Sequence, residues 1–167
     1  MATRRRTNKP VIPVFFAYKS TGEDACDTFI AYDTIHLNTG EFQLSADYKE
    51  ILIKKAGFYE ITIDAGYDCT GTARYNCRTY LYLNGVALPG AVCGTYHRTT
   101  LDGEDSASIH WMQYLEKNDI VSVYADADNA AVHVEPGFNR IMIKFIPVRG
   151  WNNNAGGKID YRGGVMR

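Results

Sequence analysis

The 167-residue sequence lacks several features that would place it in a specialised class of protein. It has no run of about 18 apolar residues, so we expect nothing in it to span a membrane. Residues 1–10 carry arginines with no apolar run behind them, which does not fit a secretory signal. Apolar residues make up 46% and charged residues 22%, which excludes a wholly disordered chain, a collagen and a coiled coil. The length suits one domain with its own core.

Metal-binding and catalytic motifs are also absent. The four cysteines form no Cys-x-x-Cys pair, and the four histidines lack metal-ligand spacing. There is no Gly-x-Ser-x-Gly, phosphate loop or His-Glu-x-x-His. The acidic runs Asp102–Asp105 and Asp126–Asn129 are interpreted as solvated loops, with hard-cation binding as the alternative. Cys69 and Cys77 could cross-link neighbouring strands, but buried thiols are the favoured interpretation. We therefore expect no enzyme, no cofactor and no metal.

Charge is divided unevenly along the chain. Residues 1–10 hold four basic residues and no acid, and residues 149–167 hold four basic residues against Asp160. Because the net charge is −1, residues 11–148 carry −8. Such asymmetry indicates that the ends contact something else. The predicted docking residues are Arg4, Arg5, Arg6, Lys9, Trp151, Lys158, Tyr161, Arg162 and Arg167.

The same division suggests three segments: a basic arm (1–10), a folded domain (11–148) and a tail (149–167). Five of the 19 tail residues are glycine, and Asn152–Asn154 are consecutive asparagines. Spaced apolar residues such as Trp151 and Tyr161 are not needed in a freely solvated tail. We interpret the tail as an extended docking segment.

Apolar alternation and turn residues recur throughout the folded domain. Asn84-Gly85 is a strong hairpin dipeptide, and Asn118 lies in another turn. No ten-residue stretch fits helical recurrence better than a strand. Eight to ten short strands indicate an all-β sandwich, jelly roll or barrel. The predicted strands include residues 11–18, 29–37, 50–54, 57–63, 78–83, 107–115, 120–125 and 139–148.

Several ordered motifs carry a family resemblance. In chain order they are Phe16–Tyr18, Tyr32–Asn38, Ile53 with Gly57–Ile61, Leu81–Gly85, Leu115–Val123 and Gly137–Phe138. Together they resemble the globular head of complement subcomponent q and its tumour necrosis factor (TNF) relatives, a ten-stranded jelly roll that trimerises. The sequence departs from the family's motifs at two positions. Asn118 stands where the family usually has glycine, and Ile53 stands where it has an aromatic residue. Asn tolerates positive φ next best, so the turn is expected to survive.

The resemblance implies a homotrimer with both termini at one end. It places Tyr59, the tyrosine of the Gly-x-Tyr motif, at the trimer axis. The 13% aromatic content exceeds what a core needs and suits an interface. We therefore add Tyr114, Phe138 and Tyr124 to the predicted trimer interface, with packing inside one chain as the alternative for each.

The expected function is a non-enzymatic, trimeric structural or adhesion protein of a particle surface. The favoured particle is a virus or bacteriophage capsid, with the protein as a decoration or head-fibre component whose basic ends dock on an acidic or capsid protein surface. One alternative is a secreted, extracellular trimeric ligand that binds a receptor or glycan through loops 22–27, 96–105 and 126–135. Another is a small coat protein that packages nucleic acid, which is not favoured because four charges per arm are few.

Overall fold

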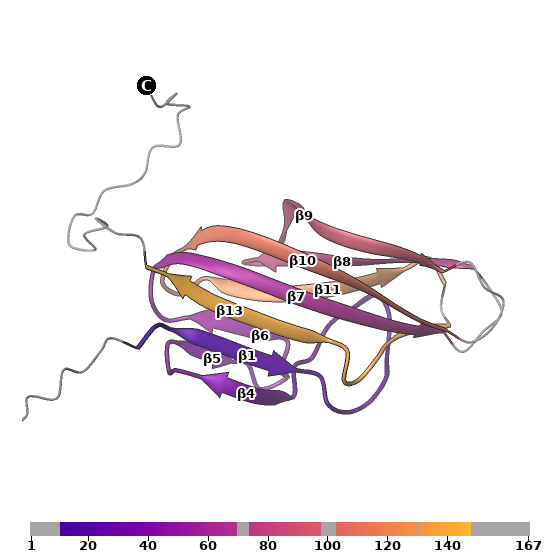
Figure 1. The fold of residues 1–167 in the computed structure, drawn as a ribbon, viewed down its shortest axis with the longest axis horizontal. Coiled ribbons are helices and arrows are strands. Elements are labelled where there is room, and N and C mark those ends of the chain that lie inside the picture. The colour runs from indigo at the N-terminus through magenta and orange to yellow at the C-terminus, as the bar shows by residue number, and fades with distance from the viewer. Residues whose placement is uncertain (1–10, 70–73, 98–102, 130, 148–167) are drawn as a thin grey trace, which may run out of the picture.

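The computed structural model describes residues 11–69, 74–97, 103–129 and 131–147, which form two antiparallel sheets packed face to face (Figure 1). No helix long and apolar enough to cross a membrane occurs in this part of the chain. The strands are β1 (Val14–Tyr18), β2 (Asp24–Ala25), β3 (Thr28–Phe29), β4 (Thr34–Asn38), β5 (Phe42–Leu44), β6 (Glu50–Ile53), β7 (Gly57–Cys69), β8 (Tyr75–Leu83), β9 (Val86–His97), β10 (Gly103–Leu115), β11 (Ile120–Ala127), β12 (Val132–Val134) and β13 (Arg140–Ile146).

The first sheet, here called sheet A, is built around the long strand β7. β10 pairs with one edge of β7, and β13 followed by β12 pairs with the other. β1 then pairs with β13, and β4 pairs with β1. The strands β4, β1, β13, β7 and β10 therefore lie side by side, and the short β2 extends β12.

The second sheet, sheet B, has the order β5-β6-β11-β8-β9, and the short β3 pairs with β11. The β8–β9 hairpin closes through Asn84 and Gly85, whose φ angles are 52° and 79°. Positive φ at both positions is what a two-residue hairpin turn requires, so the predicted turn is confirmed. Asn118 also adopts positive φ, at 75°, which confirms that this turn survives without glycine.

The core lies between the sheets and takes every second residue of strands such as β1, β7 and β8. In β7, the side chains of Tyr59, Ile61 and Ile63 are fully buried, whereas those between them lie on the outward face. Two residues of opposite sheets meet inside this core, because the hydroxyls of Tyr67 (β7) and Thr79 (β8) are hydrogen-bonded. Because successive side chains point to opposite faces of a sheet, this alternation determines which residues face outward and can contact another protein.

The predicted all-β class is confirmed, but the described residues form thirteen strands rather than eight to ten. Several of the added strands, such as β2, β3 and β12, have only two or three residues. The predicted strand 29–37 divides into β3 and β4, and the long β9 was not predicted. The acidic run 102–105, interpreted as a loop, lies from Gly103 onward in β10.

Both ends of the described chain lie at one end of the sandwich (Figure 1). Val14 at the start of β1 is the partner of Lys144 near the end of β13, and the Phe145 amide donates to the Pro13 carbonyl at 2.9 Å. The basic arm and the tail, with all nine predicted docking residues, lie outside the described residues.

Candidate functional site

One candidate interaction surface is the outward face of β4, β1, β13, β7 and β10, here called the sheet A face. Apolar side chains lie at both ends of this face, with Phe58, Tyr114 and Met112 near the start of β7 and Phe138 beside Gly66. Met112 is 72% exposed and Phe138 is 49% exposed. The rings of Phe58 and Tyr114 pack edge to face, with centroids 5.3 Å apart. Large exposed apolar areas of this kind mark interaction sites in soluble proteins.

Two ion pairs lie on the sheet A face. Arg140 lies 3.6 Å from Asp64, and Lys144 lies 3.9 Å from Glu60. Each of these pairs joins directly opposed residues of β13 and β7. The face thus combines apolar side chains with paired charges, a pattern that favours burial against a second protein surface.

Tyr59 does not belong to this face. Its side chain is fully buried inside its own chain, packs against Phe42 and Phe145, and donates a hydrogen bond to the Lys55 carbonyl at 2.6 Å. Burial, with a smaller contribution from Glu41, raises the pKa of Tyr59 to about 12. The prediction that Tyr59 lines a trimer axis is therefore wrong, because the side chain has no surface left for a partner.

The other three predicted interface residues divide between the two sheets. Tyr114 and Phe138 lie on the sheet A face, whereas Tyr124 lies on the outward face of β11 in sheet B. A close approach shapes the position of Phe138, since a Cβ added to Gly66 would lie 2.3 Å from the Phe138 Cβ. Only Tyr114 and Phe138 can therefore belong to one continuous surface.

Sequence reasoning missed the residues that contribute most to the sheet A face. Phe58, Met112 and Phe16 were not predicted to be interface residues. The Phe16 ring packs edge to face on His36, with ring centroids 5.3 Å apart. A signal was present, since Phe58 alternates with the isoleucines at 61 and 63 and must point away from them. The same alternation would have assigned Tyr59 to the core.

A second surface, the sheet B face, is the outward side of β3, β11, β8 and β9. Phe29, Tyr82 and Tyr124 pack together there, with ring centroids 5.1 to 5.8 Å apart. Asp126 follows Tyr124 on the same side of β11 and lies 3.6 Å from Arg78. This face therefore places carboxylates beside an aromatic cluster.

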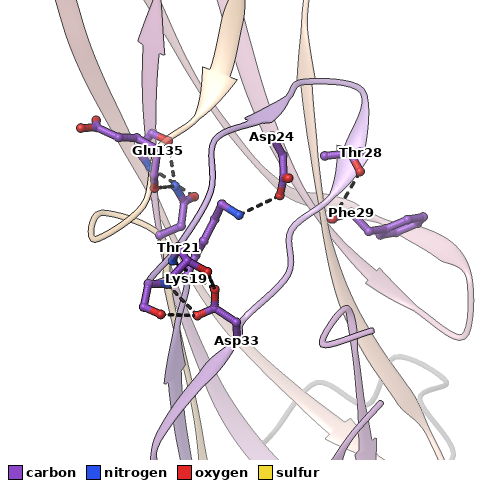
Figure 2. Close-up of polar contacts among 10 residues, drawn as sticks. Lys19, Thr21, Asp24, Thr28, Phe29, Asp33 and Glu135 are labelled. Carbon is purple, nitrogen blue, oxygen red and sulfur yellow. Dashed lines mark hydrogen bonds and ion pairs between the residues drawn. The ribbon is translucent and has the colours of Figure 1, made fainter. Parts of the chain in front are cut away.

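The loop end, opposite the termini, is held by polar contacts (Figure 2). The Lys19 side chain is only 3% exposed, and its ammonium lies 2.8 Å from a carboxylate oxygen of Asp24. Asp33 accepts five hydrogen bonds. Four come from the backbone amide and the hydroxyl of both Ser20 and Thr21, at 2.7 to 3.1 Å, and one comes from the Thr34 hydroxyl, at 3.2 Å. These contacts fix the segment that joins β1 to β4.

Hydrogen bonding governs the ionisation of Asp33. Burial raises the pKa of this carboxyl group, but the bonds from Ser20 and Thr21 together outweigh that effect and hold the pKa well below its usual range. Nearby, the buried Asn139 side chain donates to the carbonyls of Gly66 and Glu135 and so ties the β12–β13 connection to β7. The loop end is therefore preorganised.

The described residues contain no group of three or more His, Cys, Asp or Glu side chains placed to hold a metal ion. Cys26 lies beside the carboxylates of the sheet B face. Burial, followed by the charges of Asp27 and Asp126, raises the pKa of the Cys26 thiol to about 12. A thiol with this pKa is a poor nucleophile at neutral pH.

No family model matches the sequence, and no curated protein matches it. Among solved structures, the structure of Eiger TNF from S. frugiperda aligns with a TM-score of 0.62 and 10% sequence identity, covering 81% of this chain and 93% of that chain. Similarity at this identity shows the fold alone, and the chain is accordingly a TNF-like jelly-roll sandwich. It supports the TNF-like side of the resemblance and does not extend to complement subcomponent q.

Proposed function

We propose that the protein is a non-enzymatic homotrimer and a structural or adhesion component of a particle surface, favouring a virion. Its basic ends dock on the particle while the loop end points outward. The observation that carries the trimer is the sheet A face, where Met112, Phe138 and the Phe58–Tyr114 ring pair stay accessible beside paired charges. A second copy is the partner that such a face suits best.

The edge formed by β9 and β10 is the surface that we expect to meet the sheet A face of a neighbouring copy in the trimer. Among the described strands, β10 pairs only with β7 and β9 pairs only with β8, so two long edges lie next to each other. Trp111 of β10 lies close to Gly90 of β9, since a Cβ added at Gly90 would be 3.8 Å from the Trp111 ring. When this edge contacts the sheet A face of the next copy, two different patches meet, and such contacts can close into a ring.

The placement of the chain ends supports docking at one end. Pro13 and Phe145 are hydrogen-bonded neighbours, so the two ends of the described chain, which lead to the arm (residues 1–10) and the tail (149–167), lie side by side. A trimer would gather six basic segments there. Clustered charges of one sign favour an acidic surface over a neutral one.

The oligomer is tested by light scattering of the full chain, which is expected to give three times the monomer mass. Removal of residues 149–167 is then expected to leave the trimer intact and to abolish co-sedimentation with the particle. A trimer that still binds the particle without the tail would refute the docking role. A monomeric full chain would refute the trimer itself.

A second candidate function, a secreted trimeric ligand, is favoured by the rigid loop end. Recognition loops bind best when they are ordered before binding. The four hydrogen bonds from Ser20 and Thr21 to Asp33 order the segment between β1 and β4 in this way. A ligand would lose receptor or glycan binding on substitution of loop residues such as Thr21 and would tolerate tail removal. The particle protein is expected to show the reverse.

A further inference from the structure

The sheet B face carries an aromatic cluster that the proposed trimer does not use. The Phe29 ring packs edge to face against Tyr82 at 5.2 Å and Tyr124 at 5.1 Å, and all three rings are partly exposed. Tyr80 is the cross-strand partner of Tyr124, and Val92 is the partner of Tyr80. The result is a continuous apolar row across β3, β11, β8 and β9.

A row of charges borders these rings and is not balanced. Asp27 precedes β3 and is exposed, Asp126 lies next to it on β11, and Arg78 is the cross-strand partner of Asp126. The Arg78–Asp126 distance is 3.6 Å, and the Arg78 side chain is about half exposed. Among the described residues, Arg78 is thus the one cation that forms an ion pair with these two carboxylates.

The surroundings of Asp126 disfavour its ionisation next to Asp27. Burial raises the pKa of Asp126, and the neighbouring Asp27 raises it further, whereas Arg78 only partly offsets this. The pKa of Tyr124 is also raised, first by burial and then by Asp27 and Asp126. An added cation at this position would relieve the repulsion between the two carboxylates.

A guanidinium group fits both features, because it stacks on aromatic rings and bonds carboxylates in a planar, two-pronged geometry. Within the described residues Lys55 lies over the Phe145 ring at 4.9 Å, but no cation lies over Phe29, Tyr82 or Tyr124. The face is therefore complementary to an arginine supplied from outside these residues.

We propose that the sheet B face binds the arginine run Arg4–Arg6 of a second copy of this chain. This inference rests on the proposed trimer, and it has the arm link trimers to one another while the tail (149–167) holds the particle. Charge complementarity supports a second copy, since residues 11–148 carry −8 and residues 1–10 carry +4. Arg5 lies eight residues before Pro13, a reach of at most about 28 Å. Pro13 bonds to β13 of the opposite sheet, so the face of a neighbouring copy is more directly reached than its own.

The test uses a fluorescent peptide with the sequence of residues 1–10 and fluorescence anisotropy. The receptor is the full chain carrying Arg4→Ala, Arg5→Ala and Arg6→Ala, so that its own arm does not compete. We expect binding that weakens with salt. A peptide with glutamine at the three arginine positions should not bind, and one with lysine should bind more weakly, because it keeps the charge but loses the planar stacking.

Receptor variants then locate the site. Asp27→Asn with Asp126→Asn is nearly isosteric and should weaken peptide binding by about tenfold or more, as expected for loss of charge-assisted contacts. The matched control, Glu23→Gln with Glu116→Gln, removes the same charge from exposed positions off the face and should leave affinity within about twofold. Equal weakening by both pairs, or equal binding of the glutamine peptide, would overturn the proposal.

A final measurement tests the second copy. Sedimentation of the unmodified chain at low salt should show species heavier than the trimer, and the triple arginine variant should lose them while keeping the trimer. Heavier species that persist in that variant would overturn the assignment to Arg4–Arg6. Loss of the trimer itself would instead count against the proposed function, so the two failures are distinguishable.

Discussion

The two outward faces of the sandwich have similar aromatic content and differ in their charge pattern. On the sheet A face, Arg140 and Asp64 are matched across adjacent strands, as are Lys144 and Glu60. On the sheet B face, Asp126 has a like charge, Asp27, as a close neighbour, and one cation, Arg78, within ion-pair distance. Exposed rings alone would therefore not tell the faces apart. The matched face suits burial against another copy, and the unmatched face suits a cationic segment.

The largest expected effect comes from placing one lysine on the sheet A face and comparing it with a lysine on the sheet B face. Met112→Lys places a lysine opposite Glu60 on the sheet A face, which the fold should tolerate because Met112 is 72% exposed. Burying that charge at the proposed contact should weaken trimer formation by about 100-fold or more. Light scattering should then report a monomer.

The matched control is Val92→Lys on the sheet B face, where Val92 is 45% exposed. Its mass should stay that of the unmodified protein. A trimer that survives Met112→Lys but not Val92→Lys would exchange the roles assigned to the two faces.

A second substitution changes the shape of the sheet A face. Gly66→Ala would place a Cβ 2.3 Å from the Phe138 Cβ, so Phe138 must move away from β7. Overpacking of this kind typically costs about 1–3 kcal/mol. Urea denaturation measures the loss of stability. Wild-type stability in the Gly66→Ala variant would show that Phe138 is not fixed by this close approach.

A third prediction concerns the contact that joins the two sheets behind their faces. Tyr67→Phe removes the hydroxyl bond to Thr79 and should lower the free energy of unfolding by about 1–2 kcal/mol. Tyr32→Phe is the matched control, because Tyr32 is also fully buried but its hydroxyl has no hydrogen-bond partner among the described residues. That variant should be as stable as the wild type or more so. Equal losses in both variants would show that the Tyr67–Thr79 bond adds nothing.

The smallest expected effects have opposite signs and lie on opposite sides of about pH 4, the ordinary pKa of an aspartate. The folded-state pKa of Asp33 is lowered, so its stabilisation is present above about pH 4, near the unfolded value, and is lost as the pH falls. Asp33→Asn should therefore be less stable than wild type at pH 7, with a smaller difference at pH 3.

The folded-state pKa of Asp126 is raised, so ionisation of this group costs stability as the pH rises through that value. Asp126→Asn should be slightly more stable than wild type at pH 7 and should show no gain at pH 3. Denaturation curves at both pH values test the pair of variants. A loss of stability at pH 7 in Asp126→Asn would show that its bond to Arg78 outweighs the repulsion from Asp27.

The sequence predicted those parts of the fold that local chemistry determines. The turns at Asn84-Gly85 and Asn118 depend on residues that tolerate positive φ, so they could be recognised without tertiary information. β9 was missed because Pro89, Gly90 and Gly94 interrupt its alternation. The two-residue strands β2 and β3 exist only through their partners, which no local pattern reveals.

The candidate site was harder to predict, because a strand pattern gives two faces without saying which faces the core. Tyr114 and Phe138 lie on the outward face of sheet A, and their place in a trimer interface stays a prediction. Tyr59 was assigned through a family resemblance, although it lies on the same side of β7 as the core residues Ile61 and Ile63. Grouping Tyr124 with Tyr114 failed for another reason. The two residues lie on different sheets, and only the topology shows this.

The hydrogen-bonded neighbours Pro13 and Phe145 have a mechanical consequence. Because β1 and β13 are antiparallel and both chain ends leave at the same point, a force pulling the two ends apart would unzip this strand pair one hydrogen bond at a time. A force applied between that point and the loops at the opposite end would instead act along the strands, so that the hydrogen bonds between β1 and β13 are loaded together in shear. A molecule gripped by both ends and tugged at its tip is therefore held in the more resistant of the two geometries.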